Sequence, residues 1–136
     1  MLRSGGRAYR TNAMERKPNL VVIVDDDESI QDALQDLLDS AGLPARAFGS
    51  ANQFLESGVC SETGCLIADI RMPGMSGLEL QARLKADQYK IPIIFITAHG
   101  DGRTRLQAMR EGAVEFLSKP FDHQVLLKKV RAALEM

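Results

Sequence analysis

Near the start of the chain, residues 20–27 read LVVIVDDD, five apolar residues followed at once by three aspartates. Four of the five apolar residues are β-branched, and no polar residue alternates with them. Both properties are typical of a strand that is buried on both faces of a parallel sheet. We therefore predict a strand over Asn19–Val24, with three acidic side chains directly after it.

A helix is predicted after these aspartates, which gives a first strand–helix unit. Apolar residues recur there at the spacing of one helix face, at Ile30, Ala33, Leu34, Leu37, Leu38 and Ala41. Asp27 can cap the start of this helix, and Gly42 with Pro44 ends it.

Four more units of the same kind follow. We predict their strands over Ala45–Phe48, Gly64–Ala68, Ile93–Ile96 and Ala113–Leu117. We predict their helices from about Ser50 to Glu56, Leu78 to Ala86, Asp101 to Glu111 and Asp122 to about Leu134. Five units are too few for an eight-fold barrel, which needs about 250 residues. The expected fold is α/β, a doubly wound three-layer sandwich with a five-stranded parallel sheet.

Composition limits the class of protein further. The chain has 136 residues, of which 45% are hydrophobic and 26% charged, and this is the length of one domain. No apolar run approaches the ~20 residues that cross a bilayer, so no membrane contact is expected. Residues 18–136 hold 12 basic and 17 acidic residues, which argues against a general attraction to nucleic acid.

The first 17 residues differ from the rest. They hold five basic residues and one acidic residue, without the apolar stretch of a secretory signal. We predict a disordered basic leader over residues 1–17, or translation that begins at Met14, although the Arg-rich segment also has the character of a transit peptide. The two cysteines, Cys60 and Cys65, are too few for a disulfide framework or a four-ligand metal site, so we expect reduced thiols in a cytoplasmic protein.

Polar residues gather at the carboxyl ends of the predicted strands. They are Asp25, Asp26 and Asp27 after the first strand, Asp69 after the third, Thr97 after the fourth and Lys119 after the fifth. If the strand order is 2-1-3-4-5, the first and third strands are neighbours where the strand order reverses, which is where such sheets bind ligands. Asp25, Asp26 and Asp69 should therefore converge, and converging carboxylates require a proton or a cation.

Three hard oxygen donors suit Mg²⁺. Lys119 and the hydroxyl of Thr97 are expected on the other side of this cluster. The combination predicts a phosphoryl-transfer site whose nucleophile is a carboxylate. Each residue alone also has a structural explanation: Asp27 as a helix cap, Asp69 as a turn residue, Thr97 as a cap and Lys119 as a solvated loop residue. Their joint placement on four of five strand ends favours the functional interpretation.

The same residues carry a resemblance to a known family. They stand in the segments Val24-Asp25-Asp26, Asp69-Ile70-Arg71-Met72-Pro73-Gly74-Met75-Ser76-Gly77, Ile96-Thr97-Ala98 and Lys119-Pro120-Phe121. These segments resemble the receiver domain of bacterial two-component response regulators, over residues 18–136. The resemblance implies a flavodoxin-like, CheY-like fold whose five strands have the order 2-1-3-4-5. It also implies a phosphoacceptor switch rather than an enzyme, whose only chemistry is its own phosphorylation and dephosphorylation.

By this resemblance, Asp69 accepts a phosphoryl group from a sensor histidine kinase. Asp25, Asp26 and Asp69, with the backbone carbonyl of Arg71, would bind Mg²⁺, and Asp26 is expected as a direct ligand. The Asp69 carboxylate would thus both bind the metal and accept the phosphoryl group.

The resemblance also implies a conformational switch. Lys119 would pair with the bound phosphate, and Thr97 would move to hydrogen-bond one of its oxygens. Phe116 would then turn inward behind Thr97. The family usually has a cis peptide bond between Lys119 and Pro120.

Arg71 and His99, each two residues beyond a site residue, border the path of a hydrolytic water. We predict that they set the lifetime of the phosphorylated form; the alternative is that both point to solvent.

The output is inferred from local similarity. Residues 97–101 and 112–121 resemble receivers that are joined to LuxR-type helix-turn-helix domains. The abrupt end after the last helix favours a receiver excised from a transcription regulator, and the alternative is a stand-alone receiver that binds a protein or passes its phosphoryl group onward. DNA contact is expected only through an output domain. The fourth helix, fifth strand and fifth helix form the face through which the family commonly dimerises.

Two other classes compete with this interpretation. A Mg²⁺-dependent aspartyl-phosphate phosphatase usually has an acid two residues after the nucleophile, where this chain has Arg71. A flavodoxin-type nucleotide binder requires a Gly- or Ser/Thr-rich loop after the first strand, where this chain has three aspartates.

Overall fold

The computed structural model describes residues 17–98 and 102–135. Its strands are β2 (Leu20–Val24), β3 (Ala45–Phe48), β4 (Thr63–Ala68), β5 (Ile93–Thr97) and β6 (Glu115–Ser118). Its helices are α2 (Glu28–Ser40), α3 (Ala51–Ser57), α4 (Gly77–Ala86), α5 (Gly102–Arg110) and α6 (His123–Leu134), with a short 3₁₀ helix, η1, at Cys60–Glu62. The basic leader predicted over residues 1–17 lies outside the described residues except for its last position.

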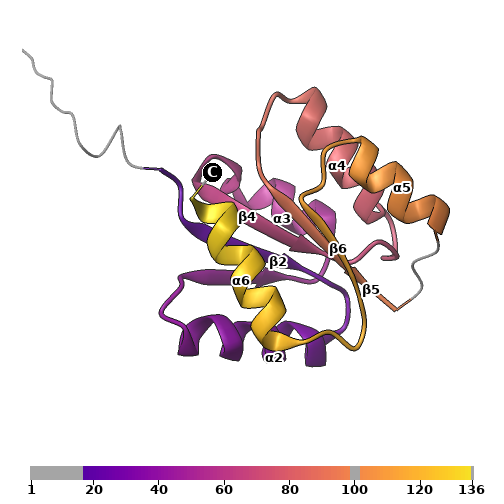
Figure 1. Cartoon of the computed structure of the whole chain (residues 1–136). Coiled ribbons are helices and arrows are strands. Elements are labelled where there is room, and N and C mark those ends of the chain that lie inside the picture. Colours follow the sequence, from indigo (N-terminus) through magenta and orange to yellow (C-terminus); the bar gives the residue numbers. More distant parts are fainter. Residues whose placement is uncertain (1–16, 99–101, 136) are drawn as a thin grey trace, which may run out of the picture.

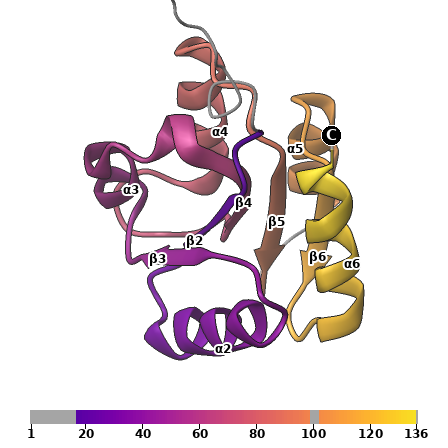
Figure 2. The same ribbon diagram turned by 90° about the vertical axis from the view of Figure 1, so that its left-hand side faces the viewer.

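The five strands form one parallel sheet in the order β3-β2-β4-β5-β6. Helices α2 and α6 cover one face of the sheet, whereas α3, α4 and α5 cover the other (Figures 1 and 2). This arrangement confirms the predicted doubly wound sandwich and its strand order, and it makes β2 and β4 neighbours at the reversal point.

The core explains why the first strand has no polar alternation. Val21 and Ile23 pack with α2 and α6, whereas Val22 and Val24 pack with the helices of the opposite face. All four side chains are 0% exposed. A strand between two helical layers buries both of its faces, so every position favours an apolar residue.

Several element bounds differ from the predicted ones. β5 extends through Thr97, and β6 begins at Glu115 rather than Ala113. The later start arises because Gly112, with φ of 108°, ends α5, and the Ala113 N–H donates to the Ala108 carbonyl at 3.0 Å. The prediction that Ala33 lies on the buried face of its helix was wrong, since this residue is exposed and Leu34 and Leu38 fill the core instead.

Within the described residues, no helix is both long and apolar enough to cross a membrane.

Both cysteines are buried and outside disulfides, which predicts very slow thiol chemistry. Burial raises the pKa of Cys65 to about 12, and burial, with a smaller effect of Asp87, raises the pKa of Cys60. At pH 8 the reactive thiolate of Cys65 is therefore on the order of a thousandfold rarer than in an ordinary cysteine. We expect Ellman's reagent to label the folded chain slowly, at Cys60 before Cys65, and both thiols rapidly in urea. Rapid labelling of Cys65 in the folded chain would contradict the packing of β4.

Candidate phosphoryl-transfer and metal site

An acidic cluster lies at the carboxyl ends of β2 and β4. The Asp69 N–H donates to the Val24 carbonyl at 3.1 Å, which continues the pairing of the two strands into the loops that follow them. Carboxylate oxygens of Asp25, Asp26 and Asp69 lie within 4.8 Å of one another. The predicted convergence of these three residues is thus present in the structure.

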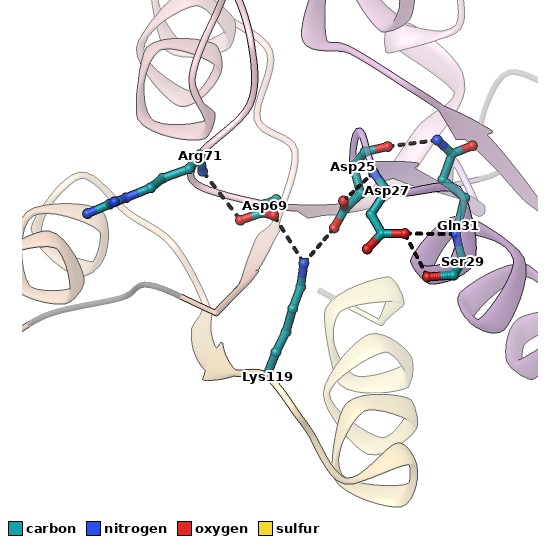
Figure 3. A network of polar contacts seen from close by, with 7 residues as sticks. All are labelled: Asp25, Asp27, Ser29, Gln31, Asp69, Arg71 and Lys119. Carbon is teal, nitrogen blue, oxygen red and sulfur yellow. Dashed lines mark hydrogen bonds and ion pairs between the residues drawn. The ribbon is translucent and has the colours of Figure 1, made fainter.

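A single lysine joins two members of this cluster. Lys119 follows β6, and its Nζ lies 3.0 Å from Asp25 Oδ2 and 3.0 Å from Asp69 Oδ2 (Figure 3). The peptide bond between Lys119 and Pro120 is cis, as the resemblance implied. The Asp25 side chain is 1% exposed and that of Lys119 is 16% exposed, so water screens this ion pair weakly.

The pKa values of the two groups reflect this packing. Burial raises the pKa of Asp25, and the hydrogen bonds from the Asp27 N–H and Lys119 offset only part of that increase. Burial acts to lower the pKa of Lys119, but its contacts with Asp25 and Asp69 outweigh burial and raise it. The ammonium therefore stays charged, and it balances the negative charge of the cluster.

The loop between β2 and α2 fixes the position of Asp25. The Asp27 N–H donates to Asp25 Oδ1 at 2.9 Å, and Gln31 Nε2 donates to the Asp25 carbonyl at 2.7 Å (Figure 3). Asp27 caps α2 by accepting from the Ser29 N–H at 2.9 Å, which confirms its predicted structural role. The contribution of Gln31 was missed, because nothing in the sequence distinguishes it from an ordinary polar helix residue.

The loop between β4 and α4 holds Asp69. The Arg71 N–H donates to Asp69 Oδ1 at 3.3 Å, and the Gly77 N–H donates to the Ile70 carbonyl at 2.8 Å. Ser76 and Glu79 form a reciprocal capping box at the start of α4. The Arg71 side chain is exposed and extends away from Asp69 (Figure 3).

The remaining predicted site residues are Thr97, Phe116 and His99. Thr97 is 1% exposed at the end of β5, and its carbonyl accepts from the Lys119 N–H at 2.9 Å. Phe116 is 4% exposed, with its ring 6.4 Å from that of Phe95 in the next strand. The ring therefore already lies inward. His99 lies outside the described residues.

The donor set fits a magnesium ion. Asp25, Asp26 and Asp69 offer three carboxylate oxygens within 4.8 Å of one another, and Mg²⁺ prefers a few carboxylates together with water and phosphate oxygens. Asp26 is exposed, so the cluster is open to solvent on that side. These three residues would hold the ion, next to the Lys119 ammonium, which contacts Asp25 and Asp69.

The Lys119→Met variant tests whether the lysine ammonium balances the negative charge of Asp25 and Asp69. Without the ammonium, two buried carboxylates lose their partner, so in magnesium-free buffer we expect a loss of about 3 kcal/mol in the free energy of unfolding. Added Mg²⁺ should recover part of the loss, and should raise the urea midpoint of the variant more than that of the wild type. Lys128→Met, which changes an exposed lysine on α6, is the control. If magnesium raised the urea midpoints of Lys119→Met and the wild type equally, Lys119 would not balance the charge of these carboxylates.

The fold and the site together define a class of protein, namely a doubly wound domain with an acidic cluster at its topological switch point and a lysine that contacts it. Comparison with known families agrees with this definition. The pattern of the response regulator receiver domain matches residues 21–131. The chain belongs to the response regulator receiver domain family. It is accordingly a domain of a signalling switch, and members of this family typically bind Mg²⁺ at an acidic pocket and are phosphorylated by sensor kinases.

Individual relatives support the assignment. The response regulator protein TodT of Pseudomonas putida is 45% identical over 123 residues, which cover 90% of this chain and 54% of that protein. Nodulation protein W of Bradyrhizobium diazoefficiens is 49% identical over 116 residues, which cover 85% of this chain and 51% of that protein. The chain thus spans about half the length of the curated relatives it matches.

Solved structures give the same result. The response regulator StyR is similar with a TM-score of 0.81 and 49% identity, over 88% of this chain and 60% of that one. The FixJ-N crystal structure is similar with a TM-score of 0.79 and 38% identity, over 88% of this chain and 96% of that one.

Proposed function

We propose that Asp69 accepts a phosphoryl group from the phospho-histidine of a sensor kinase, and that the domain then changes conformation to control an output. The observation that carries the proposal is the contact of Lys119 Nζ with both Asp25 and Asp69, at 3.0 Å each. A fixed cation among the carboxylates of an acidic cluster can stabilise the negative charge of a transferred phosphoryl group.

In the proposed step, a carboxylate oxygen of Asp69 attacks phosphorus. The bond from phosphorus to the histidine nitrogen breaks, and its electron pair stays on the imidazole. Mg²⁺, when bound, neutralises charge on the phosphoryl oxygens. Lys119 would exchange its contact with Asp69 for one with a phosphoryl oxygen, while Asp25 keeps the other side of the ammonium charge-balanced. The backbone carbonyl of Arg71 would be a further metal ligand.

The proposed response involves Thr97 and Phe116. Thr97 stands at the carboxyl end of β5 and is joined through its carbonyl to Lys119, so a new charge at Asp69 acts on both residues. Thr97 would hydrogen-bond a phosphoryl oxygen, and the buried ring of Phe116 would be held behind it.

The output we infer is control of transcription in the cytoplasm. Relatives at 41–44% identity include the transcriptional regulatory proteins TdiR and FixJ. DNA would be contacted by a separate output domain and not by this one, since residues 18–136 are acidic on balance. The face formed by α5, β6 and α6 is the proposed surface for a homodimer.

Incubation with acetyl phosphate and Mg²⁺ tests the proposal, with intact mass as the readout. We expect one added phosphoryl group in the wild type, and none in Asp69→Asn or after chelation of the metal. A folded, magnesium-supplied chain that gains no phosphoryl group would contradict the proposal.

Arg71 and His99 are proposed to set the lifetime of the phosphorylated form. Arg71 is exposed and its N–H already contacts Asp69 Oδ1, so rotation of its side chain can cover the acyl phosphate. We expect Arg71→Ala to lose its phosphoryl group several-fold faster than the wild type, with Arg46→Ala, at an exposed position on β3, as the control. The loss is followed by intact mass after acetyl phosphate is removed. Equal rates would exclude a role for the Arg71 side chain.

A further inference from the structure

Helix α5 is weakly anchored to the rest of the domain. Ala108 is its one buried residue. Leu106 and Met109 are 57% and 37% exposed. A helix that buries so little apolar surface relies on polar side chains to fix its position, and it can shift at low cost. Such contacts include a hydrogen bond from Gln81 Nε2 to the Ala108 carbonyl at 3.0 Å and one from Arg105 to β6.

The contact of Arg105 is directed at one residue, Phe116. Arg105 Nη1 donates to the Phe116 carbonyl at 3.3 Å, and the guanidinium carbon lies 6.0 Å from the centre of the Phe116 ring. A guanidinium near an aromatic ring is attracted to its π-electrons. The same side chain thus binds both the backbone and the ring of this residue.

The edge position of β6 explains why its backbone is available. Among the residues that the structure describes, β6 is the last strand in the sheet order and pairs with β5 alone. The Phe116 N–H donates to Glu115 Oε1 at 3.0 Å, and Glu115 Oε2 lies 3.0 Å from Lys129 Nζ of α6. Both polar backbone groups of Phe116 are therefore satisfied by side chains, one of which comes from α5.

The charges around this contact are complementary. Burial acts to raise the pKa of Glu115, but the Phe116 N–H, Lys129 and Arg105 outweigh burial and lower it. Glu115 thus stays ionised between two cations, one on α5 and one on α6. A displacement of Arg105 would therefore change three things together: the hydrogen bond to the Phe116 carbonyl, the cation near the Phe116 ring and the charge next to Glu115.

We propose that Arg105 is a positioning residue that holds the Phe116 ring inward before phosphorylation and so couples α5 to the phosphorylation site. This inference rests on the proposed function, in which the inward ring belongs to the phosphorylated conformation. A contact that favours this conformation strengthens phosphoryl binding, because the two equilibria are linked. Loss of Arg105 lets the ring leave its site and weakens the binding of a phosphoryl group.

The test uses the full chain labelled with 4-fluorophenylalanine. The chain has five phenylalanines, and Phe116→Leu assigns the signal of interest. In phosphate-free protein, we expect Arg105→Ala to move the Phe116 fluorine signal toward that of a solvent-exposed ring. The signal of Phe54, which is 0% exposed and belongs to α3, should stay unchanged. Arg103→Ala, at an exposed position on the same helix, is the matched control and should leave the Phe116 signal in place.

The second readout is the apparent affinity for beryllofluoride, a phosphoryl mimic, in the presence of Mg²⁺. We expect Arg105→Ala to bind it about fivefold more weakly than the wild type, Arg105→Lys to restore part of the affinity, and Arg103→Ala to match the wild type. An unchanged Phe116 signal in Arg105→Ala would overturn the inference, as would a displaced ring with unchanged affinity. Failure of the wild type to bind beryllofluoride would instead contradict the proposed function, and the fluorine signal would still decide whether Arg105 holds the ring.

Discussion

The Asp25→Asn variant is expected to bind Mg²⁺ about 100-fold more weakly than the wild type. Asp25 supplies a carboxylate that is 1% exposed and fixed by the Asp27 N–H. The amide keeps the shape of the side chain but removes the charge that attracts a hard cation. Lys119 then has Asp69 as its remaining partner, so the ammonium competes more strongly with the metal for that carboxylate. A loss of this size corresponds to about 2.7 kcal/mol.

The control for this prediction is Asp27→Asn. It removes one negative charge two residues away, while asparagine still caps a helix well. Titration calorimetry with magnesium chloride should give an affinity within about threefold of the wild type for the control, because exposed charges are screened. If Asp25→Asn also stays within that range, the assignment of Asp25 to the metal site is wrong.

The Gly77→Ala variant is expected to lose about 3 kcal/mol of stability, because overpacking against backbone is costly. A Cβ at this position would stand 2.3 Å from the Asp69 carbonyl oxygen and 3.0 Å from the Phe95 ring. The first of these distances cannot be relieved by a side-chain rotation, so the start of α4 must move away from the loop that carries Asp69. We therefore also expect slower phosphorylation by acetyl phosphate.

Urea denaturation measures this effect, and Gly102→Ala provides the comparison. Gly102 begins α5, and a Cβ added there meets no atom within 4 Å. Alanine favours a helix over glycine by roughly 1 kcal/mol, so the control should be neutral or slightly more stable. A Gly77→Ala variant as stable as the wild type would mean that α4 does not pack on the Asp69 loop as described.

The fold could be predicted from the sequence because its signals are local and repeated. Each strand that lies inside the sheet carries a dense apolar run, and Asp27, Gly42 and Gly112 mark helix ends through cap and turn chemistry. The errors occur where a tertiary contact decides the outcome. The start of β6 depends on the Ala113 N–H, which closes α5 and so does not pair with β5. The exposure of Ala33 depends on the rotation of α2 about its axis, and an alanine side chain is too small to determine that rotation.

The candidate site was predictable in its residues and less so in its contacts. The spacing of aspartates at strand ends and the known geometry of doubly wound sheets are enough to bring Asp25, Asp26 and Asp69 together. The contact of Lys119 with Asp25, the hydrogen bond from Gln31 and the contact of Arg105 with Phe116 depend on side-chain positions in three dimensions. Arg105 in particular stands on a charged helix face, where the sequence pattern is that of an ordinary solvated surface.

The most direct test of the account is to trap the acyl phosphate and locate it. An aspartyl phosphate is a mixed anhydride, and borohydride reduces its carbonyl carbon to an alcohol with release of phosphate, which converts the residue to homoserine. After treatment with acetyl phosphate, Mg²⁺ and borohydride, we predict homoserine at position 69 in the peptide map, and unmodified aspartates at positions 25 and 26. Homoserine at another position, or at none in a folded and magnesium-supplied chain, would contradict the assignment of Asp69 as the phosphoryl acceptor.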